Sequence, residues 1–235
     1  MKILTISDII VPSLYSPEIS PNYHDIDLVI SCGDLPLSYL EYINSLLNKS
    51  MYYVHGNHTP SSRHGYIQTP AVAAGGINIH RRVIKDDSGL LLSGIEGCVV
   101  YNKGPYQYTQ AEMWGLIWRL VPNLFLNKLL YHRYLDVFIS HAPPWKIHDE
   151  EDLPHQGIKA FRWLIKVFKP ALHIHGHTHV YNPNTLTESL YRNTWIINTF
   201  GHRVLEIDPN NLSGGNVLTH NELFTDHLHQ QEDQL

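Results

Sequence analysis

Five short apolar runs, each with at least one β-branched residue and each followed by polar residues, constrain the fold of this chain more than any other feature. Short runs without polar alternation are typical of strands that are buried on both faces, as in the parallel sheets of α/β proteins. We therefore expect strands at residues 2–7, 28–32, 51–54, 136–140 and 171–175.

The segments between these runs favour an α/β fold. Apolar residues at helical spacing predict one helix over 37–47 and another over 157–168, which ends before Pro170. Strand, helix, strand is the βαβ unit of parallel sheets. Four further strand candidates follow one another without helices, which indicates antiparallel pairing within or beside the parallel set. They are residues 78–85, 90–93, 195–198 and 204–207.

Size and composition indicate one globular domain. The chain has 235 residues, of which 43% are apolar, and a net charge of −5. This length suits one sizeable core. We expect a single domain over 1–220, with a turn after Asp208 that returns through Val217 and Leu218, and an acidic, disordered tail over 221–235. Outside that tail the chain is close to neutral and has no basic track for nucleic acid.

The cysteines and the apolar segments indicate the compartment. Cys32 and Cys98 lie in apolar contexts, so we expect buried thiols rather than a disulfide. The first strand begins at Lys2, which leaves no room for a signal peptide, and no apolar run is long enough to span a membrane. We expect a cytoplasmic protein.

Polar motifs follow the predicted strands. Asp8 follows the first strand, Gly33-Asp34 the second and Gly56-Asn57-His58 the third. His141 follows the fourth, and Gly176-His177-Thr178-His179 the fifth. The C-terminal ends of parallel strands meet at one edge of a sheet, where ligands bind, so these side chains should converge.

Taken singly, most of these motifs are also common turns or helix caps. The histidines are harder to explain in that way, because four of them alternate from His173 to His179 and a core has little use for such a run. The order of the motifs resembles the calcineurin-like metallophosphoesterase family, whose pattern runs Asp-x-His, Gly-Asp, Gly-Asn-His, His and Gly-His-x-His. The resemblance spans Asp8 to His179.

This resemblance implies a fold of two packed mixed β-sheets flanked by helices, a four-layer α-β-β-α sandwich. It also implies a metal-dependent phosphoester hydrolase, in which two divalent ions hold a hydroxide as nucleophile and offset the charge of the phosphoryl oxygens. The implied cofactors are one or two divalent ions per chain, with Mn²⁺ ahead of Fe, Zn, Ni or Mg. The implied substrate is a small phosphoester.

The resemblance also assigns a role to each motif residue. Asp34 would bridge both ions, and Asp8 and His179 would bind one of them. The other ion would be held by Asn57, His141 and His177. The full set of implied metal ligands is therefore Asp8, Asp34, Asn57, His141, His177 and His179. His58 would lie beyond the ions, steady the phosphate and protonate the leaving oxygen, because the pKa of an imidazole lies near the working pH.

Two positions depart from the family pattern. Ile10 stands where the family has its first histidine, and Thr59 stands where the residue after Gly-Asn-His is usually acidic. Asp8, Asp34 and His179 alone should bind an ion weakly or prefer a hard one such as Mn²⁺ or Mg²⁺. We expect a slow or specialised phosphodiesterase or phosphomonoesterase. The alternative is a catalytically weak or inactive metal- or phosphate-binding module that retains the fold.

An aromatic segment over 102–118 leads into a further helix through Thr109 and Glu112, a capping-box pair. It is either a wall over the metal site or ordinary core, and core is the default for its tryptophans. The stretch that continues to Leu135 is amphipathic. Core packing is again the default, and a dimer surface or contact with a lipid-like substrate is the alternative.

Overall fold

The computed structural model describes residues 1–59, 62–64, 67–69, 72–182, 184–209, 212 and 217–220. Within these ranges the chain forms two six-stranded sheets, two short pairs of strands and four α-helices. The tail predicted over 221–235 lies outside the described residues.

The first sheet has the strand order β16-β15-β1-β2-β3-β6. Strands β1, β2, β3 and β6 run parallel, whereas β15 pairs antiparallel with both β1 and β16. The bounds are Lys2–Ser7 (β1), Leu28–Ser31 (β2), Ser50–Tyr53 (β3), Gly76–Asn78 (β6), Gly201–Ile207 (β15) and Val217–His220 (β16).

The second sheet has the order β13-β14-β12-β11-β8-β7. Its four inner strands are parallel and its two edge strands are antiparallel to their neighbours. The bounds are Val83–Lys85 (β7), Leu91–Ile95 (β8), Val137–Ser140 (β11), Leu172–His175 (β12), Glu188–Tyr191 (β13) and Thr194–Asn198 (β14). The short pairs are Ser62–His64 (β4) with Ile67–Thr69 (β5), and Cys98–Val99 (β9) with Gln107–Tyr108 (β10).

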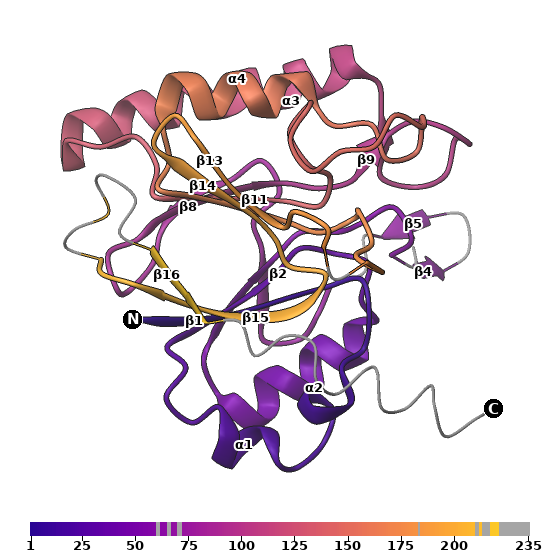
Figure 1. Ribbon diagram of the computed structural model, residues 1–235, viewed down its shortest axis with the longest axis vertical. Helices are drawn as coiled ribbons and strands as arrows, with labels where there is room; N and C mark the ends of the chain where they lie inside the picture. The colour runs from indigo at the N-terminus through magenta and orange to yellow at the C-terminus, as the bar shows by residue number, and fades with distance from the viewer. Residues whose placement is uncertain are drawn as a thin grey trace.

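Helices cover the outer face of each sheet, which gives the expected four layers (Figure 1). Helices α1 (Ile19–Asn22) and α2 (Leu37–Leu47) lie against the first sheet, with a 3₁₀ turn at Pro12–Leu14 before them. Helices α3 (Gln110–Tyr131) and α4 (Lys159–Phe168) lie against the second. None of the helices in the described ranges is long and apolar enough to cross a membrane.

Alternation of side chains along the strands fills three apolar layers. On β1, Ile3 packs between the sheets and Leu4 packs toward α2. On β11, Val137 packs between the sheets and Phe138 packs toward α3 and α4. All four side chains are fully buried. Strands buried on both faces have little room for polar side chains along their length, so polar residues that bind ligands are concentrated at the strand ends.

Most predicted elements match the observed ones, and the predicted helix over 37–47 is α2. The return of the chain after Asp208 is confirmed, because Val217 pairs with Ile207. The prediction of one strand over 78–85 is wrong. The chain there leaves β6 in the first sheet and enters β7 in the second, and it turns between them at Arg81, whose φ is 59°. Both cysteines are buried and free, as expected.

The expectation that the alternating histidines do not belong to a core is wrong for two of them. His173 and His175 lie on β12 and are fully buried. The Nε2 atom of His173 lies 2.7 Å from Ser140 Oγ, and His175 Nε2 lies 3.0 Å from Nδ1 of His148. His148 in turn contacts Ser189 Oγ through Nε2, at 2.8 Å. These imidazoles are therefore polar residues of the interior, held by hydrogen bonds to one another and to serines.

This buried group should make the protein sensitive to acid. Burial lowers the pKa of His148 to about 4 and that of His173 to about 3, so the unfolded chain binds protons below pH ~6.5 that the folded chain does not. We expect the free energy of unfolding to fall as the pH drops from about 6.5 to 5. His148→Gln should flatten this slope by up to about 1.4 kcal/mol per pH unit.

Urea unfolding in the presence of a chelator, at several pH values, measures this slope. The control is His24→Gln, because His24 is exposed and its Nδ1 lies 3.0 Å from the Pro21 carbonyl oxygen at the surface. Equal slopes for His148→Gln and the unsubstituted protein would contradict the assignment.

Candidate metal centre

The predicted site residues follow strands of both sheets. Asp8, Asp34 and Asn57 follow β1, β2 and β3 of the first sheet, and His141 and His177 follow β11 and β12 of the second. Because the two sheets pack face to face, these strand ends meet at one edge of the molecule. The site is therefore assembled from both halves of the sandwich.

The backbone at three of these positions has an unusual conformation. The φ angles are 68° at Asp8, 55° at Asp34 and 69° at His177. Residues other than glycine rarely adopt this left-handed conformation, which costs of the order of 1 kcal/mol or more, and such residues cluster at functional sites. Each strand thus ends in a sharp turn that directs a polar side chain toward the edge of the sheets.

Glycines next to these turns allow a close approach of the backbones. A Cβ at Gly56 would lie 2.1 Å from Asp34 Oδ1, and one at Gly176 would lie 2.4 Å from Asp8 Oδ2. At Gly33, whose φ is 103°, a Cβ would lie 2.5 Å from the Gly56 nitrogen. The glycines of the three motifs are therefore required by packing around the carboxylates.

His141 lies at the centre of a compact group of polar atoms. Its Nε2 atom is 3.0 Å from Asn57 Oδ1, 3.1 Å from His177 Nδ1 and 3.2 Å from Asp34 Oδ2. Ligand atoms that share one divalent ion lie about 3 Å apart, since each is about 2.1 Å from the ion. The four side chains therefore have the spacing of a mixed nitrogen and oxygen coordination sphere.

Main-chain carbonyls determine which nitrogens of the two histidines face this group. His141 Nδ1 lies 2.9 Å from the Cys32 carbonyl oxygen, and His177 Nε2 lies 2.8 Å from that of Pro154. A carbonyl only accepts, so these two nitrogens donate. When both imidazoles are neutral, His141 Nε2 and His177 Nδ1 are therefore left as acceptors that face each other, beside the acceptor oxygens of Asn57 and Asp34. Four neighbouring acceptors need a positive charge among them, which a bound cation or a proton on His141 can supply.

Electrostatics in the metal-free protein reflect the same convergence. Burial alone would lower the pKa of His141, but the carboxylates of Asp34 and Asp8 raise it to about 9. Burial likewise acts to raise the pKa of Asp34, and His141 lowers it to about 2. Burial, together with the charge on His141, lowers the pKa of His177 to about 3. Without a metal ion, a proton on His141 therefore supplies the positive charge that a bound cation would otherwise supply to this group.

Asp8 lies next to this group. Both of its carboxylate oxygens accept a hydrogen bond from the backbone nitrogen of His177, at 3.1 Å. Burial raises the pKa of Asp8, and the nearby His141 acts to lower it. Asp8 thus ties the end of β1 to the end of β12.

The remaining predicted residues lie at the rim. The backbone nitrogen of His58 donates to Asp34 Oδ1 at 2.7 Å, and its side chain is exposed. His179 is exposed, and its Nδ1 lies 2.7 Å from the Tyr181 hydroxyl. The centroids of the His179 and Phe200 rings are 4.8 Å apart. Ile10, in the place of the missing histidine, is 43% exposed.

Two further side chains hold the predicted ligands in place. Asn57 Nδ2 donates to the Tyr101 hydroxyl at 3.1 Å, which directs Oδ1 toward His141. Thr59, which departs from the family pattern, is buried, and its hydroxyl accepts from the Gly56 nitrogen at 3.0 Å, so it supports the turn that carries Asn57. The sequence did not indicate a role for Tyr101, which immediately precedes the aromatic segment over 102–118.

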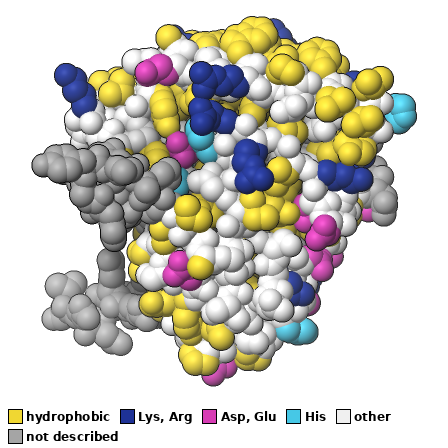
Figure 2. Space-filling view, turned by 180° about the vertical axis from the view of Figure 1, so that it is seen from behind, with side chains coloured by type: hydrophobic (Ala, Val, Ile, Leu, Met, Phe, Trp, Pro, Cys, Tyr) yellow, Lys and Arg dark blue, Asp and Glu magenta, His cyan; other side chains and the backbone are white. Residues whose placement is uncertain are grey.

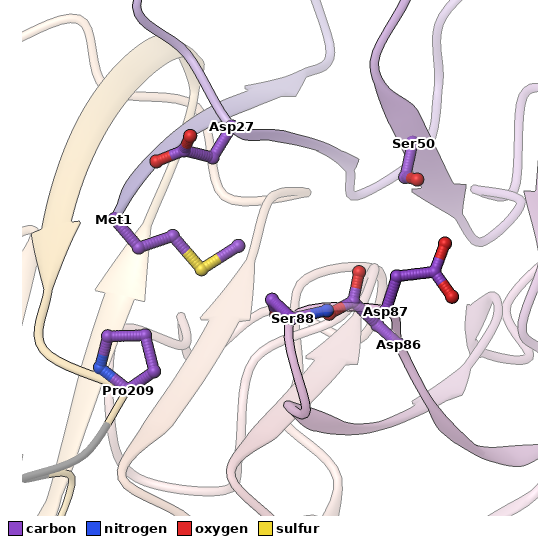
Figure 3. A pocket seen from close by; sticks show the side chains of 7 residues that line it. All are labelled: Met1, Asp27, Ser50, Asp86, Asp87, Ser88 and Pro209. Atoms are coloured by element: carbon purple, nitrogen blue, oxygen red, sulfur yellow. The ribbon is translucent and has the colours of Figure 1, made fainter.

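A pocket opens at the opposite edge of the sheets, near the starts of β1 and β3 (Figure 3). The residues that line it are Met1, Asp27, Ser50, Asp86, Asp87, Ser88 and Pro209. It contains three carboxylates and no Lys or Arg, which does not suit a phosphate group. None of the predicted ligands lines it.

Comparisons with known proteins agree with the geometry. A family model described as calcineurin-like phosphoesterase matches residues 1–181. The chain therefore belongs to the calcineurin-like phosphoesterase family. No curated protein sequence matches the chain.

A solved structure shows the same fold. TT1561 of Thermus thermophilus aligns with a TM-score of 0.58 and 15% identity, over 94% of this chain and 98% of that one. At such an identity the likeness concerns the fold alone. Zinc-bound Vps29 from Entamoeba histolytica aligns with a lower TM-score of 0.43 and 14% identity, over 94% of this chain and 97% of that one.

The contact between Tyr101 and Asn57 predicts a role in metal binding. Tyr101→Phe removes the hydroxyl that accepts from Asn57 Nδ2, so the amide is free to rotate its oxygen away from His141. We expect the affinity for Mn²⁺ to fall about tenfold, the effect typical of losing a group that orients a ligand. Calorimetric titration measures it. Tyr131→Phe, at the far end of α3, is the control and should bind normally. Unchanged affinity in Tyr101→Phe would contradict this role.

Proposed function

We propose that the protein is a metal-dependent phosphoester hydrolase that acts on a small phosphodiester or phosphomonoester. The observation that carries the proposal is that Asn57 Oδ1, His177 Nδ1 and Asp34 Oδ2 lie 3.0, 3.1 and 3.2 Å from His141 Nε2, while the other ring nitrogen of each histidine donates to a main-chain carbonyl. Such a donor set suits a divalent transition ion, and we propose Mn²⁺ first. Family membership supports the reaction class.

The chain would hold ions at the edge where the two sheets meet. Asp34, Asn57, His141 and His177 would bind one ion. Asp34 would also bridge to a second, together with Asp8 and His179. When bound, divalent ions supply positive charge against the phosphoryl oxygens and make water more acidic.

Asp34 would also position His58, through a hydrogen bond that does not require a bound ion. One of its oxygens faces His141, and the other accepts from the backbone nitrogen of His58. This bond fixes the turn that carries His58 relative to the ligands. The His58 ring is exposed, while the neighbouring Asn57 is buried, so His58 is available to a substrate rather than to the ions. We assign to it the proton donated to the leaving oxygen.

Substitutions separate these roles. With Mn²⁺ and bis(p-nitrophenyl) phosphate, Asp34→Asn and His141→Ala should lose both bound metal and hydrolysis. His58→Ala should keep its metal and slow by a factor of about a hundred or more, the usual contribution of a general acid. His132→Ala, at the C-terminal end of α3, is the control. Metal content and initial rates are measured on the same samples, and full activity in Asp34→Asn would refute the proposal.

One observation favours a second candidate, a binding module that holds a single ion. Among the described residues, the buried group of metal-ligating side chains is Asp34, His141 and His177. Ile10 contributes no donor to the second ion, and Nδ1 of His179 is bonded to Tyr181. On this interpretation the second position has been lost, and the protein binds metal or phosphate without turnover.

Ile10→His distinguishes the two candidates. For an enzyme, we expect the unsubstituted protein to hydrolyse bis(p-nitrophenyl) phosphate or p-nitrophenyl phosphate, because its residues already hold the ions that it needs. For a binding module, the unsubstituted protein should contain one ion and show no turnover, and Ile10→His alone should gain a second ion and activity. Ile10→Gln is the matched control, since it adds polarity at the same exposed position without an imidazole.

A further inference from the structure

Helix α3 has two apolar faces, and described residues cover only one of them. Its inner face packs on the second sheet and α4 through fully buried side chains such as Met113, Ile117 and Leu124. Its outer face exposes large apolar side chains to solvent. These are Trp118 (55% exposed), Phe125 (55%), Leu126 (49%), Leu129 (75%) and Leu130 (56%).

The exposed residues form one continuous stripe. Trp118, Pro122, Phe125, Leu126 and Leu129 recur at intervals of three and four, so they lie on one side of the helix, and we call them the outer stripe. One turn before Trp118, Gly115 continues this side with open space around it. Single exposed apolar residues are ordinary, but a contiguous patch of large ones marks an interaction surface.

The helical layer that carries the outer stripe has mainly positive charge. Helices α3 and α4 contain the cations Arg119, Lys128, Lys159, Arg162 and Lys166. Lys128 donates to the His132 carbonyl, Arg162 donates to the Trp145 carbonyl and Lys159 lies over the Trp145 ring, whereas Arg119 and Lys166 are exposed. Their one acidic residue, Glu112, is in the first turn of α3 and is engaged in the capping box with Thr109. The whole chain has a net charge of −5, so this helical layer has the opposite sign to the protein as a whole.

Figure 2 shows hydrophobic side chains gathered over the top of the molecule, where Figure 1 places α3 and α4, with Lys and Arg side chains among them. This combination of charge and apolar area restricts what can cover the stripe. A second copy placed across a twofold axis would bring the same cations together. A partner with an apolar interior and a negatively charged surface would match both the apolar stripe and the positive charge of these helices.

We propose that α3 is a docking surface for an anionic lipid bilayer. The helix would lie in the plane of the membrane, with Trp118, Phe125 and Leu129 buried at the boundary between headgroups and acyl chains. The exposed cations Arg119 on α3 and Lys166 on α4 would pair with lipid phosphates. Helices that bind membranes in this way combine aromatic and leucine residues on one side with Lys and Arg beside them.

Sedimentation with lipid vesicles tests the proposal on the full chain. We expect binding to vesicles of phosphatidylcholine mixed with phosphatidylglycerol, and weaker binding to phosphatidylcholine alone or at raised salt. The double variant Phe125→Ser, Leu129→Ser should bind the mixed vesicles at least about tenfold less, because two large apolar side chains no longer leave water. Both residues are more than half exposed, but the Phe125 ring also contacts Tyr134 and Phe168 edge-on, so thermal unfolding is used to verify that the variant keeps its fold.

Matched variants identify the surface. Leu186→Ser, Leu190→Ser removes two residues that are comparably exposed, at 67% and 56%, but lie outside α3, and it should bind like the unsubstituted protein. Arg119→Gln, Lys166→Gln should weaken binding at low salt. Asp34→Asn should bind normally, so the result does not depend on the proposed hydrolysis.

Three outcomes would overturn the proposal. The first is the absence of binding to mixed vesicles, and the second is equal binding to neutral ones. The third is a dimer in solution that Phe125→Ser, Leu129→Ser converts to a monomer while no vesicle is bound, which would assign the outer stripe to a second copy of the chain.

Discussion

The packing of the two sheets against each other determines where this protein can place polar chemistry. Side chains such as Ile3, Ile139 and Ile174 fill the layer between the sheets and exclude water from it. A second apolar layer lies beneath the helices on each outer face. Strands enclosed in this way carry mainly apolar side chains. The polar side chains that could bind a ligand therefore lie in the turns that follow the strands. Asp8, Asp34, Asn57, His141 and His177 meet because the C-terminal ends of β1, β2, β3, β11 and β12 are aligned by this packing.

The convergence of electron pairs at that edge has a cost that the fold must offset. In the absence of a cation, His141 has to carry a proton among buried groups, as the rise of its pKa to about 9 indicates. The backbone adds further strain, because Asp8, Asp34 and His177 all have left-handed φ angles. Such arrangements persist only where the surrounding structure holds them, and here Tyr101, Thr59 and two carbonyl groups do so. A strained arrangement that is held this firmly is evidence that its geometry serves binding.

The sequence predicted most of the fold because buried parallel strands have a simple signature. Continuous apolar runs, and the helix at 37–47, were enough to place β1, β2, β3, β11, β12 and α2. Motif order then predicted which residues would meet. The sequence did not predict contacts that depend on three dimensions. The break at Arg81 is a change of sheet within the segment 78–85, and His173 lies in the core with its Nε2 against Ser140 Oγ on the neighbouring strand. Tyr101 could not be linked to Asn57, since nothing in local spacing relates them.

The division of the ligands between the two sheets gives a bound ion a mechanical role. Cys32 and His141, which are hydrogen-bonded beside the site, are 109 positions apart in the chain. An ion held by Asp34 and His141 would act as a reversible cross-link that closes this long loop and clamps the sheets at one edge. Loop closure of this length removes much of the freedom of the unfolded chain. A bound ion would therefore oppose separation of the two sheets at that edge, and the chain would be held together there more firmly with metal than without it.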